Sequence, residues 1–178
     1  MLSVFLLTTN LFSQKLEYKM IMAAAKGDIG TVKKCLKKGA KIDARNRARW
    51  TALAYAAKYN HMNIVKLLVE KGANVNRTIN TGSTPFQVAL NRNNYNIADY
   101  LIKNNANINN KDITGMTALA WAAKAGRLKE VKYLVEHGAD VNSKNTNART
   151  VLDISGLGPV YSYLRSHGAK TSKELLKQ

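Results

Sequence analysis

A repeat of 33 residues is the feature that most constrains what this chain can fold into. A motif of Thr-x-Leu or Thr-x-Phe begins at 33-residue intervals, at Thr51, Thr84, Thr117 and Thr150. A second marker, Gly-Ala or Asn-Ala, begins at Gly39, Gly72, Asn105, Gly138 and Gly168, with a last interval of 30 residues. A third marker in the same register is Ile or Val followed by Asp or Asn, as in Ile42-Asp43 and Val75-Asn76. Three markers with one period predict a stack of equivalent supersecondary elements.

Each repeat has the pattern of two helices. The threonine at the start of the first helix is a capping residue, and Pro85 stands just inside one such helix, where its missing N–H costs nothing. Small pairs such as Ala56-Ala57 and Ala122-Ala123 allow two helices to approach closely. After a short break, a second helix carries apolar residues at helical spacing and ends at a glycine such as Gly72.

Extended connections with tips such as Asn80-Thr81-Gly82 and Thr114-Gly115 follow each pair of helices. Over roughly residues 15–170 the pattern resembles the ankyrin repeat, a β-turn plus two antiparallel helices in 33 residues. The resemblance implies an all-α fold, a solenoid of stacked helix-turn-helix units with β-hairpin-like loops.

The chain departs from the family pattern at two kinds of position. The motif histidine is replaced by Ala54, Gln87, Ala120 and Asp153, which removes the side-chain hydrogen bonds that this histidine makes in the family. The turn glycine present at Gly82 and Gly115 is replaced by Arg49 and Ala148, so we expect those two tips to be shaped differently.

The register predicts one domain, residues 14–170, between two short ends. Its repeats are expected at residues 14–45, 46–78, 79–111, 112–144 and 145–170, with atypical first and last repeats because a terminal repeat faces water on one side. Residues 171–178 form a polar tail, either a short helix or disordered.

Residues 1–13 are mostly apolar and uncharged, and they are too short to span a bilayer as a helix. They resemble the apolar region of a secretory signal with cleavage near Ser13-Gln14, although the basic start of such signals is missing. The alternative is an apolar helix that packs on the first repeat. We prefer the signal interpretation, which predicts an exported protein, whereas the alternative predicts a cytoplasmic one.

The chain carries a net charge of +17 and has a pI of about 10.1, mainly through lysine. An AT-rich coding bias explains this enrichment as well as a function does, and we favour a solvated basic surface over selected binding of nucleic acid or membrane. Cys35, the single cysteine, falls in register with Leu68, which favours a small buried side chain over a reactive thiol.

No catalytic constellation is apparent. His61, His137 and His167 are scattered over different repeats, and the last two each precede a glycine that ends a helix, where a cation complements the helix dipole. The stretch Gly156-Leu-Gly-Pro lacks the lysine and hydroxyl of a phosphate-binding loop. We therefore expect no enzymatic activity, no cofactor and no metal site.

The family resemblance implies that partners bind through the tips and the exposed side of the first helices, which line a concave groove. Carried over by position, the candidate partner-binding residues are Arg47, Arg49, Trp50, Lys58, Tyr59, Thr81, Ser83, Arg92, Thr114, Met116, Lys124, Asn147 and Arg149. Trp121 shares a register with Tyr55, Val88 and Ile154, which predicts a core residue. Trp50 shares a register with Ser83, Met116 and Arg149, which predicts an exposed residue.

The leading hypothesis is a monomeric protein-interaction module whose partner has an acidic surface. A competing hypothesis is binding of a polyanion, nucleic acid or anionic lipid, through the basic stretch from Lys33 to Arg49, but nucleic acid is disfavoured because no recognition motif or aromatic stacking platform is present. A third hypothesis, a secreted effector of a host-associated bacterium, depends on the apolar N-terminal segment and on family habit.

Overall fold

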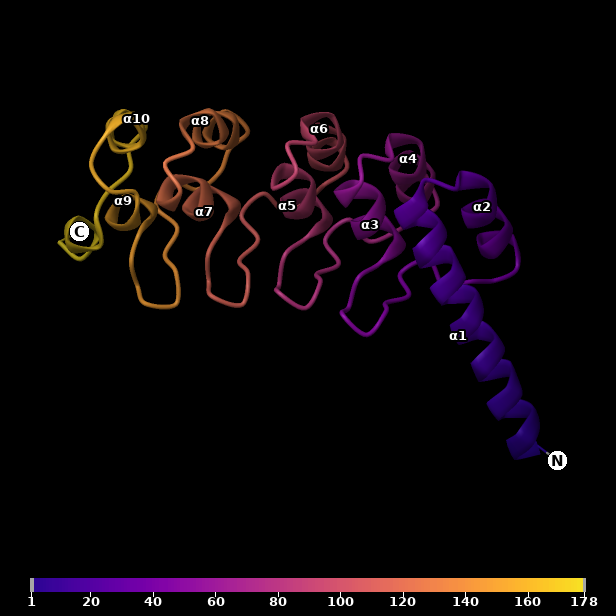
Figure 1. Cartoon of the computed structure of the whole chain (residues 1–178). Helices are drawn as coiled ribbons and strands as arrows, with labels where there is room; N and C mark the ends of the chain where they lie inside the picture. The colour runs from indigo at the N-terminus through magenta and orange to yellow at the C-terminus, as the bar shows by residue number, and fades with distance from the viewer. Residues whose placement is uncertain (1, 178) are drawn as a thin grey trace. The chain divides into compact units, whose positions relative to one another are not determined.

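The computed structural model describes residues 2–177, with side chains from Phe12 onward, as helices joined by loops (Figure 1). The chain divides into two compact units, Met1–Ala106 and Asn107–Gln178, here called the N-terminal and the C-terminal unit. The N-terminal unit contains α1 (Leu2–Lys26), α2 (Ile29–Lys37), α3 (Ala52–Lys58), α4 (Met62–Glu70), α5 (Pro85–Leu90) and α6 (Tyr95–Lys103). The C-terminal unit contains α7 (Ala118–Lys124), α8 (Leu128–Glu136), α9 (Val151–Ile154), α10 (Pro159–Ser166) and α11 (Ser172–Leu175).

The predicted all-α fold class is confirmed. No β-strand occurs in the described part of the chain, where Lys144 and Thr150 form an isolated antiparallel bridge. In each unit the first helix of a repeat lies between its second helix and its hairpin tip, so that tips and second helices are on opposite sides (Figure 1).

The predicted threonine caps begin the first helices. The hydroxyl oxygens of Thr51, Thr84, Thr117 and Thr150 each accept the backbone N–H three residues later, at 3.1 to 3.4 Å. At two of the positions where the family motif has histidine, another side chain makes a hydrogen bond to the backbone of the capping threonine. Gln87 accepts the backbone N–H of Thr84, and Asp153 accepts that of Thr150, both at 2.9 Å. Each forms a reciprocal capping box, whereas Ala54 and Ala120 leave the cap one-sided.

Small residues bring the helices together. Ala56 and Ala57 of α3 are fully buried, and α3 packs against α1, α4 and α5. Ala122 and Ala123 have the same place in α7, which packs against α8 and α9. Leucine and isoleucine from the second helices fill the space behind them, each contributing about 1.5–3 kcal/mol by burial. Cys35 is 2% exposed, so the prediction of a small buried side chain is confirmed.

The Asp or Asn of the third sequence marker joins each repeat to the next. The Asp43 carboxylate accepts the backbone N–H of Asn74 at 3.0 Å, and the Asn76 side chain donates to the Asn105 carbonyl at 3.0 Å. In the C-terminal unit, Asn109 accepts the backbone N–H of Asp140 at 2.8 Å. Asn142 continues this series to the last repeat, where it binds the backbone of Gly168 and Lys170. These side chains therefore hydrogen-bond to the backbone that follows the second helix of the following repeat.

The four hairpin tips have the same shape, so the expectation of different tips at Arg49 and Ala148 is wrong. Both residues adopt the left-handed conformation, with φ of 61° and 58°, as do Gly82 and Gly115 with 82° and 74°. Each tip closes with the same backbone bonds, for example Arg49 N–H to Asn46 O and Asn46 N–H to Trp50 O. This is the three-residue loop with a left-handed last residue, which Arg49 and Ala148 adopt at a cost of about 1–2 kcal/mol, whereas a Cβ at Gly115 would lie 2.6 Å from the Thr146 backbone nitrogen.

The two ends of the chain are both helical. α1 runs without a break through Ser13 and Gln14 and packs against α2 and α3. The signal interpretation concerns residues 1–13, whose side chains before Phe12 lie outside the described residues, so it stays a prediction. Within residues 2–177, no helix has the length and apolar character needed to cross a bilayer.

The polar tail forms α11, whose start is capped by Thr171. The Glu174 carboxylate accepts the backbone N–H of Thr171 at 2.7 Å. It also accepts one hydrogen bond from each terminal guanidinium nitrogen of Arg165, at 2.7 and 2.8 Å. Asp153 also accepts the backbone N–H of Ser172 at 3.0 Å, which holds α11 against the fifth repeat.

Replacing Ala148 with glycine should increase the free energy of unfolding by roughly 0.5–1 kcal/mol, because glycine removes the left-handed strain at a small entropic cost. The measurement is urea denaturation of the wild type, Ala148→Gly and the control Ala125→Gly. Ala125 has φ of −84°, so its replacement with glycine should not stabilise the protein. Equal effects of the two substitutions would contradict the strain at Ala148.

The contribution of Glu174 to stability should depend on pH. The hydrogen bonds from Arg165, then those from Thr171, lower the pKa of Glu174 from 4.5 to about 2. A depressed carboxyl pKa stabilises the folded state above the unfolded value and loses that effect as pH falls through the folded value. The melting temperature of Glu174→Gln should therefore lie below that of the wild type at pH 7, and the difference should shrink from pH 4.5 towards pH 2. A difference independent of pH would contradict the charged pair.

Candidate partner-binding surface

Aromatic rings and one lysine form a cluster in the N-terminal unit, at the junction of the tip at residues 46–50 with α3. The Trp50 and Tyr55 ring centroids are 4.7 Å apart, and the Tyr55 and Tyr59 rings are stacked at 6.2 Å with an interplanar angle of 4°. The Lys58 Nζ lies 5.0 Å from the ring centroids of both Trp50 and Tyr59. Here this group of four residues is called the Lys58 cluster. It combines a cation with aromatic area, of which Tyr59 is 48% exposed.

Trp50 is half-buried, so the expectation of an exposed tryptophan is wrong in part. Its ring packs on the buried side chains of Ala54, Ile79 and Val88, which come from its own and the following repeat. The candidates Lys58 and Tyr59 are therefore brought together with one edge of Trp50, and Tyr59 presents the largest accessible ring of the cluster.

Arginines gather at the same tip. Burial, then the charges of Arg77 and Arg49, lower the pKa of Arg45, so both arginines act on Arg45 as like charges. Arg77 Nε is buried without a hydrogen-bond partner among the described residues. The candidate Arg49 is exposed beside this group. Anionic groups of a partner would be favourable here because they would relieve the mutual repulsion of the arginines.

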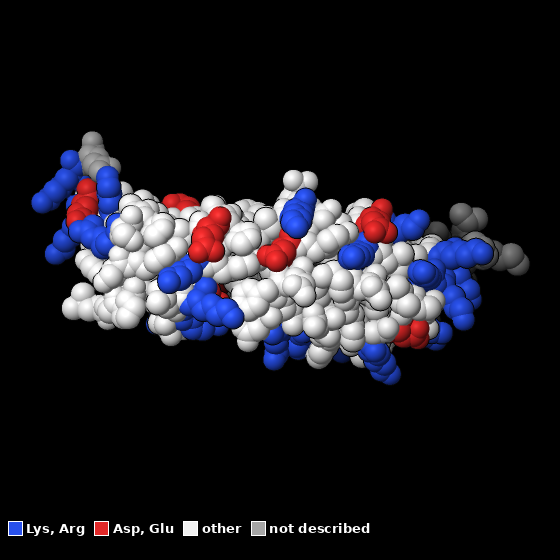
Figure 2. Space-filling model, turned by 90° about the horizontal axis from the view of Figure 1, so that it is seen from above, with Lys and Arg blue, Asp and Glu red and all other residues white. Residues whose placement is uncertain are grey.

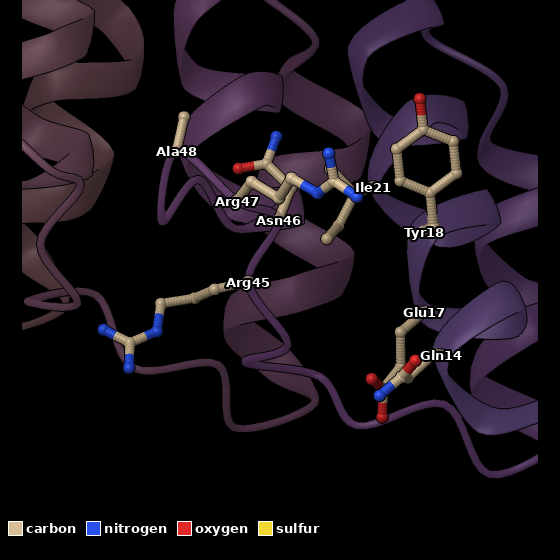
Figure 3. A pocket seen from close by; sticks show the side chains of 8 residues that line it. All are labelled: Gln14, Glu17, Tyr18, Ile21, Arg45, Asn46, Arg47 and Ala48. Carbon is tan, nitrogen blue, oxygen red and sulfur yellow. The ribbon is translucent and has the colours of Figure 1, made fainter. Parts of the chain in front are cut away.

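A hollow of about 790 Å³ separates this tip from α1 (Figure 3). Its lining comes from Gln14, Glu17, Tyr18 and Ile21 of α1, and from Arg45, Asn46, Arg47 and Ala48 of the tip. Figure 3 shows Arg47 reaching across the hollow towards α1, while the Arg45 side chain points away from that helix. Here this space is called the Arg47 hollow. Of its lining residues, Arg47 is a partner-binding candidate from the sequence, and Arg45 belongs with it to the basic stretch of the polyanion hypothesis.

The remaining candidates of the N-terminal unit are less closely grouped. Thr81 donates its hydroxyl hydrogen to Ser83 at 3.0 Å within the tip at residues 79–83. Arg92 is exposed after the end of α5. Thr81 and Arg92 are both exposed, and of these three candidates Thr81 and Ser83 contact each other.

In the C-terminal unit, the prediction that Trp121 is a core residue is wrong. The residue is 39% exposed, and its indole Nε1–H donates to the Asp112 carboxylate at 2.7 Å. The candidate Lys124 lies 5.2 Å from the Trp121 ring centroid. Burial raises the pKa of Asp112, but the bonds from Thr114, Trp121 and Met116 outweigh it and lower the net value. Trp121, Asp112 and Lys124 therefore form a second aromatic and charged group.

The first residue of the tip and the aromatic residue nine positions later form a recurrent pair. Asn46 donates its amide to the Tyr55 hydroxyl oxygen at 3.2 Å, in the same register as Asp112 with Trp121. In the third repeat both positions are apolar, Ile79 and Val88, and both are buried. Asp112, nine positions before Trp121, is the signal in the sequence that indicates a polar partner for the indole.

Met116 is a candidate that the structure places in the core. It is 5% exposed, and its sulfur accepts a hydrogen bond from the Asn145 amide at 3.8 Å. Thr114, Asn147 and Arg149 are exposed. Thr114 and Arg149 have internal partners, since Thr114 donates its hydroxyl hydrogen to Asp112 and Arg149 donates to the Asp153 carbonyl.

The histidines have structural partners. Nε2 of His61 lies 3.2 Å from the Ala25 carbonyl, where it satisfies the end of α1. His137 and His167 stand at the ends of α8 and α10, and their Nδ1 atoms lie 2.7 and 2.8 Å from the carbonyl four residues earlier. Within the described residues, no group of three or more His, Cys, Asp or Glu side chains converges as a metal site.

Glu130 is a buried carboxylate in the register of Ile64 and Ile97. Burial raises its pKa, and the charge of Arg127 acts in the opposite direction. The Arg127 guanidinium binds both carboxylate oxygens, at 3.0 and 3.1 Å. With both oxygens bound to Arg127, Glu130 has the environment of a structural ion pair.

A family model described as ankyrin repeats (3 copies) matches residues 20–112 and 106–174. These two segments include all four Thr motifs and all five Gly-Ala or Asn-Ala markers. No curated protein matches the chain.

Replacing Trp121 with phenylalanine should lower the free energy of unfolding by about 1–2 kcal/mol, because a short hydrogen bond to a carboxylate is lost. The comparison is Tyr55→Phe, which removes a longer and uncharged bond in the same register and should cost about 0.5–1 kcal/mol. The measurement is urea denaturation, repeated in an Asp112→Asn background. If the cost of Trp121→Phe were unchanged there, the hydrogen bond would not be its cause.

Proposed function

From the premise that this chain belongs to the ankyrin-repeat family, we propose that it binds a protein partner through its tips and first helices. Members of this family are generally protein-interaction modules and typically not enzymes. The observation that carries the proposal is the Lys58 cluster, where an exposed tyrosine, a tryptophan edge and a lysine meet beside several arginines. Tyr, Trp and Arg are the residues most enriched in the energetic centres of protein interfaces.

The charges around the cluster support a partner with an acidic surface. Arg49 and Arg77 each act on Arg45 as a like charge, and none of the three has an acidic partner in the described part of the chain. Carboxylates of a partner would accept their N–H groups in a bidentate manner. The aromatic rings add apolar area that a purely ionic contact lacks.

Polyanion binding remains the second candidate, supported by α2. Lys33, Lys34, Lys37 and Lys38 are all exposed there, and Figure 2 shows basic side chains gathered where α2 lies. The fold weakens this candidate because it divides the basic stretch of the sequence. The helix α2, which carries these lysines, lies on the side of the second helices, whereas the tip at residues 46–50, which carries Arg47 and Arg49, lies on the opposite side (Figure 1).

Replacing Lys58 and Tyr59 with alanine should weaken capture of the partner by more than about 1 kcal/mol, that is, at least fivefold. Tyr59 is a sharper test than Trp50, because truncation of the half-buried Trp50 would also disturb packing. The measurement is affinity capture from native lysate at physiological salt, with captured proteins identified and then titrated individually.

The matched control is Asn63→Ala with Lys66→Ala, two exposed residues of α4 whose replacement removes the same charge. Its capture should equal that of the wild type. Unchanged capture by the Lys58 and Tyr59 variant would exclude this surface. A steep loss of binding between low and physiological salt, without preference among polyanions, would instead support the second candidate.

A further inference from the structure

Neighbouring tips are joined by one backbone hydrogen bond in a fixed register. In the N-terminal unit, the backbone N–H of Asn80 donates to the Ala48 carbonyl at 3.3 Å. In the C-terminal unit, Thr146 N–H donates to the Thr114 carbonyl at 3.4 Å, and the Thr146 hydroxyl donates to the same oxygen at 3.0 Å. Within each unit, the second residue of the later tip thus donates to the third residue of the earlier tip, whereas the backbone N–H of Ile113, the second residue of the tip at residues 112–116, makes no hydrogen bond within the described residues.

The tip at residues 46–50 is the first in the chain, so its equivalent donor has no preceding tip. That donor is the backbone N–H of Arg47, and it makes no hydrogen bond within the described residues. α1 packs against α2 and α3 but does not supply the missing tip. The Arg47 hollow lies in this place, between the tip and the Gln14–Ile21 portion of α1 (Figure 3).

The chemistry of the hollow defines what would fill it. The unbonded N–H of Arg47 lies at the edge of a hairpin, where a backbone carbonyl of an extended segment can accept it, as in strand addition to an exposed edge. Arg47 reaches into the space, so a carboxylate would be bound beside that carbonyl. Tyr18 is 58% exposed on the α1 side and offers an aromatic face to an apolar side chain. Glu17, an acid in the lining, already accepts a hydrogen bond from Ser13 at 3.1 Å.

We infer that the Arg47 hollow receives one short extended acidic segment of the protein partner, which takes the place of the missing tip. A backbone carbonyl of the segment accepts the Arg47 N–H, a carboxylate of the segment pairs with the Arg47 guanidinium group, and an apolar residue contacts Tyr18. The inference rests on the proposed function, since it names the partner chemistry of a protein-interaction module.

Charge decides between this occupant and a second copy of the chain. In a head-to-tail stack, the last tip would offer the Asn147 carbonyl, the position equivalent to Ala48. That tip carries the exposed Arg149, and each chain has a net charge of +17, so two copies would bring like charges together at the Arg47 hollow. An acidic segment of another protein has the complementary charge.

The test uses the full chain, labelled with ¹⁵N, and an acetylated, amidated hexapeptide of alternating aspartate and leucine as the probe. A matched peptide with asparagine in place of aspartate is the neutral control, and polyphosphate is the source of charge without a peptide backbone. We expect the acidic peptide to shift the Arg47 amide resonance and to slow its hydrogen exchange. A response of other amides without Arg47 would overturn the inference, as would equal occupancy by polyphosphate.

Two substitutions at one residue separate the side chain from the backbone donor. Arg47→Ala keeps the N–H and removes the guanidinium, and it should weaken peptide binding at least about tenfold. Arg47→Pro also removes the N–H, at the turn position where proline is favoured, and should weaken binding about threefold further. Lys66→Ala on α4 should leave the affinity unchanged. Equal affinities of Arg47→Ala and Arg47→Pro would exclude the backbone contact.

The outcome is distinguishable from failure of the proposed function. If capture of the native partner depends on Lys58 and Tyr59 but not on Arg47, the chain is an interaction module and only the inferred segment is wrong. If sedimentation shows concentration-dependent association that Arg47→Ala abolishes, a second copy occupies the hollow and the inference is likewise wrong.

Discussion

The hydrogen bond from the Asp or Asn after one helical pair to the backbone after the next pair is the interaction on which the stacking depends. A pair of helices cannot cover its own apolar side, so each repeat is stable only against its neighbour. Burial alone would allow neighbours to slide, because apolar contact has little direction. The contacts of Asp43 with Asn74 and of Asn109 with Asp140 fix one distance along the chain, 31 residues, and thus one register. The tip-to-tip bonds repeat this constraint on the opposite side of each unit.

Much of the fold follows from local residue types whose physical role is independent of context. A threonine before a helix caps it, a glycine after a helix ends it, and small residues mark close approach, so Thr51, Gly72 and Ala56 identified their elements correctly. The expectation of different tips at Arg49 and Ala148 is wrong because glycine is preferred at these two positions but is not required there. The left-handed conformation costs an L-residue little compared with the hydrogen bonds that close the tip and join it to its neighbour.

The candidate surface was less predictable, since exposure depends on pairs of residues rather than on rows. Trp121 was placed in the core because its register is apolar elsewhere, yet Asp112 offers its indole a polar partner at the surface. Trp50 was placed at the surface because its register is mixed, yet Ile79 and Val88 of the following repeat provide an apolar site for its ring. Asp112, nine positions before Trp121, is the sequence signal for its polar partner, whereas the burial of Trp50 depends on two residues of the following repeat.

The two ends of the stack satisfy the same requirement in different ways. At the C-terminal end, the Asn142 side chain hydrogen-bonds to the backbone of Gly168 and Lys170. The backbone N–H of Ser172 in α11 donates to the Asp153 carboxylate. The polar side chains that would join a further repeat are therefore bonded within the chain itself. At the N-terminal end, α1 contributes Met20, Ile21 and Ala24 to the core but supplies no hairpin. Apolar burial and backbone hydrogen bonding are thus uncoupled at the tip at residues 46–50. The helices are covered, whereas the Arg47 donor and the space beside it are left open to a group from outside the chain.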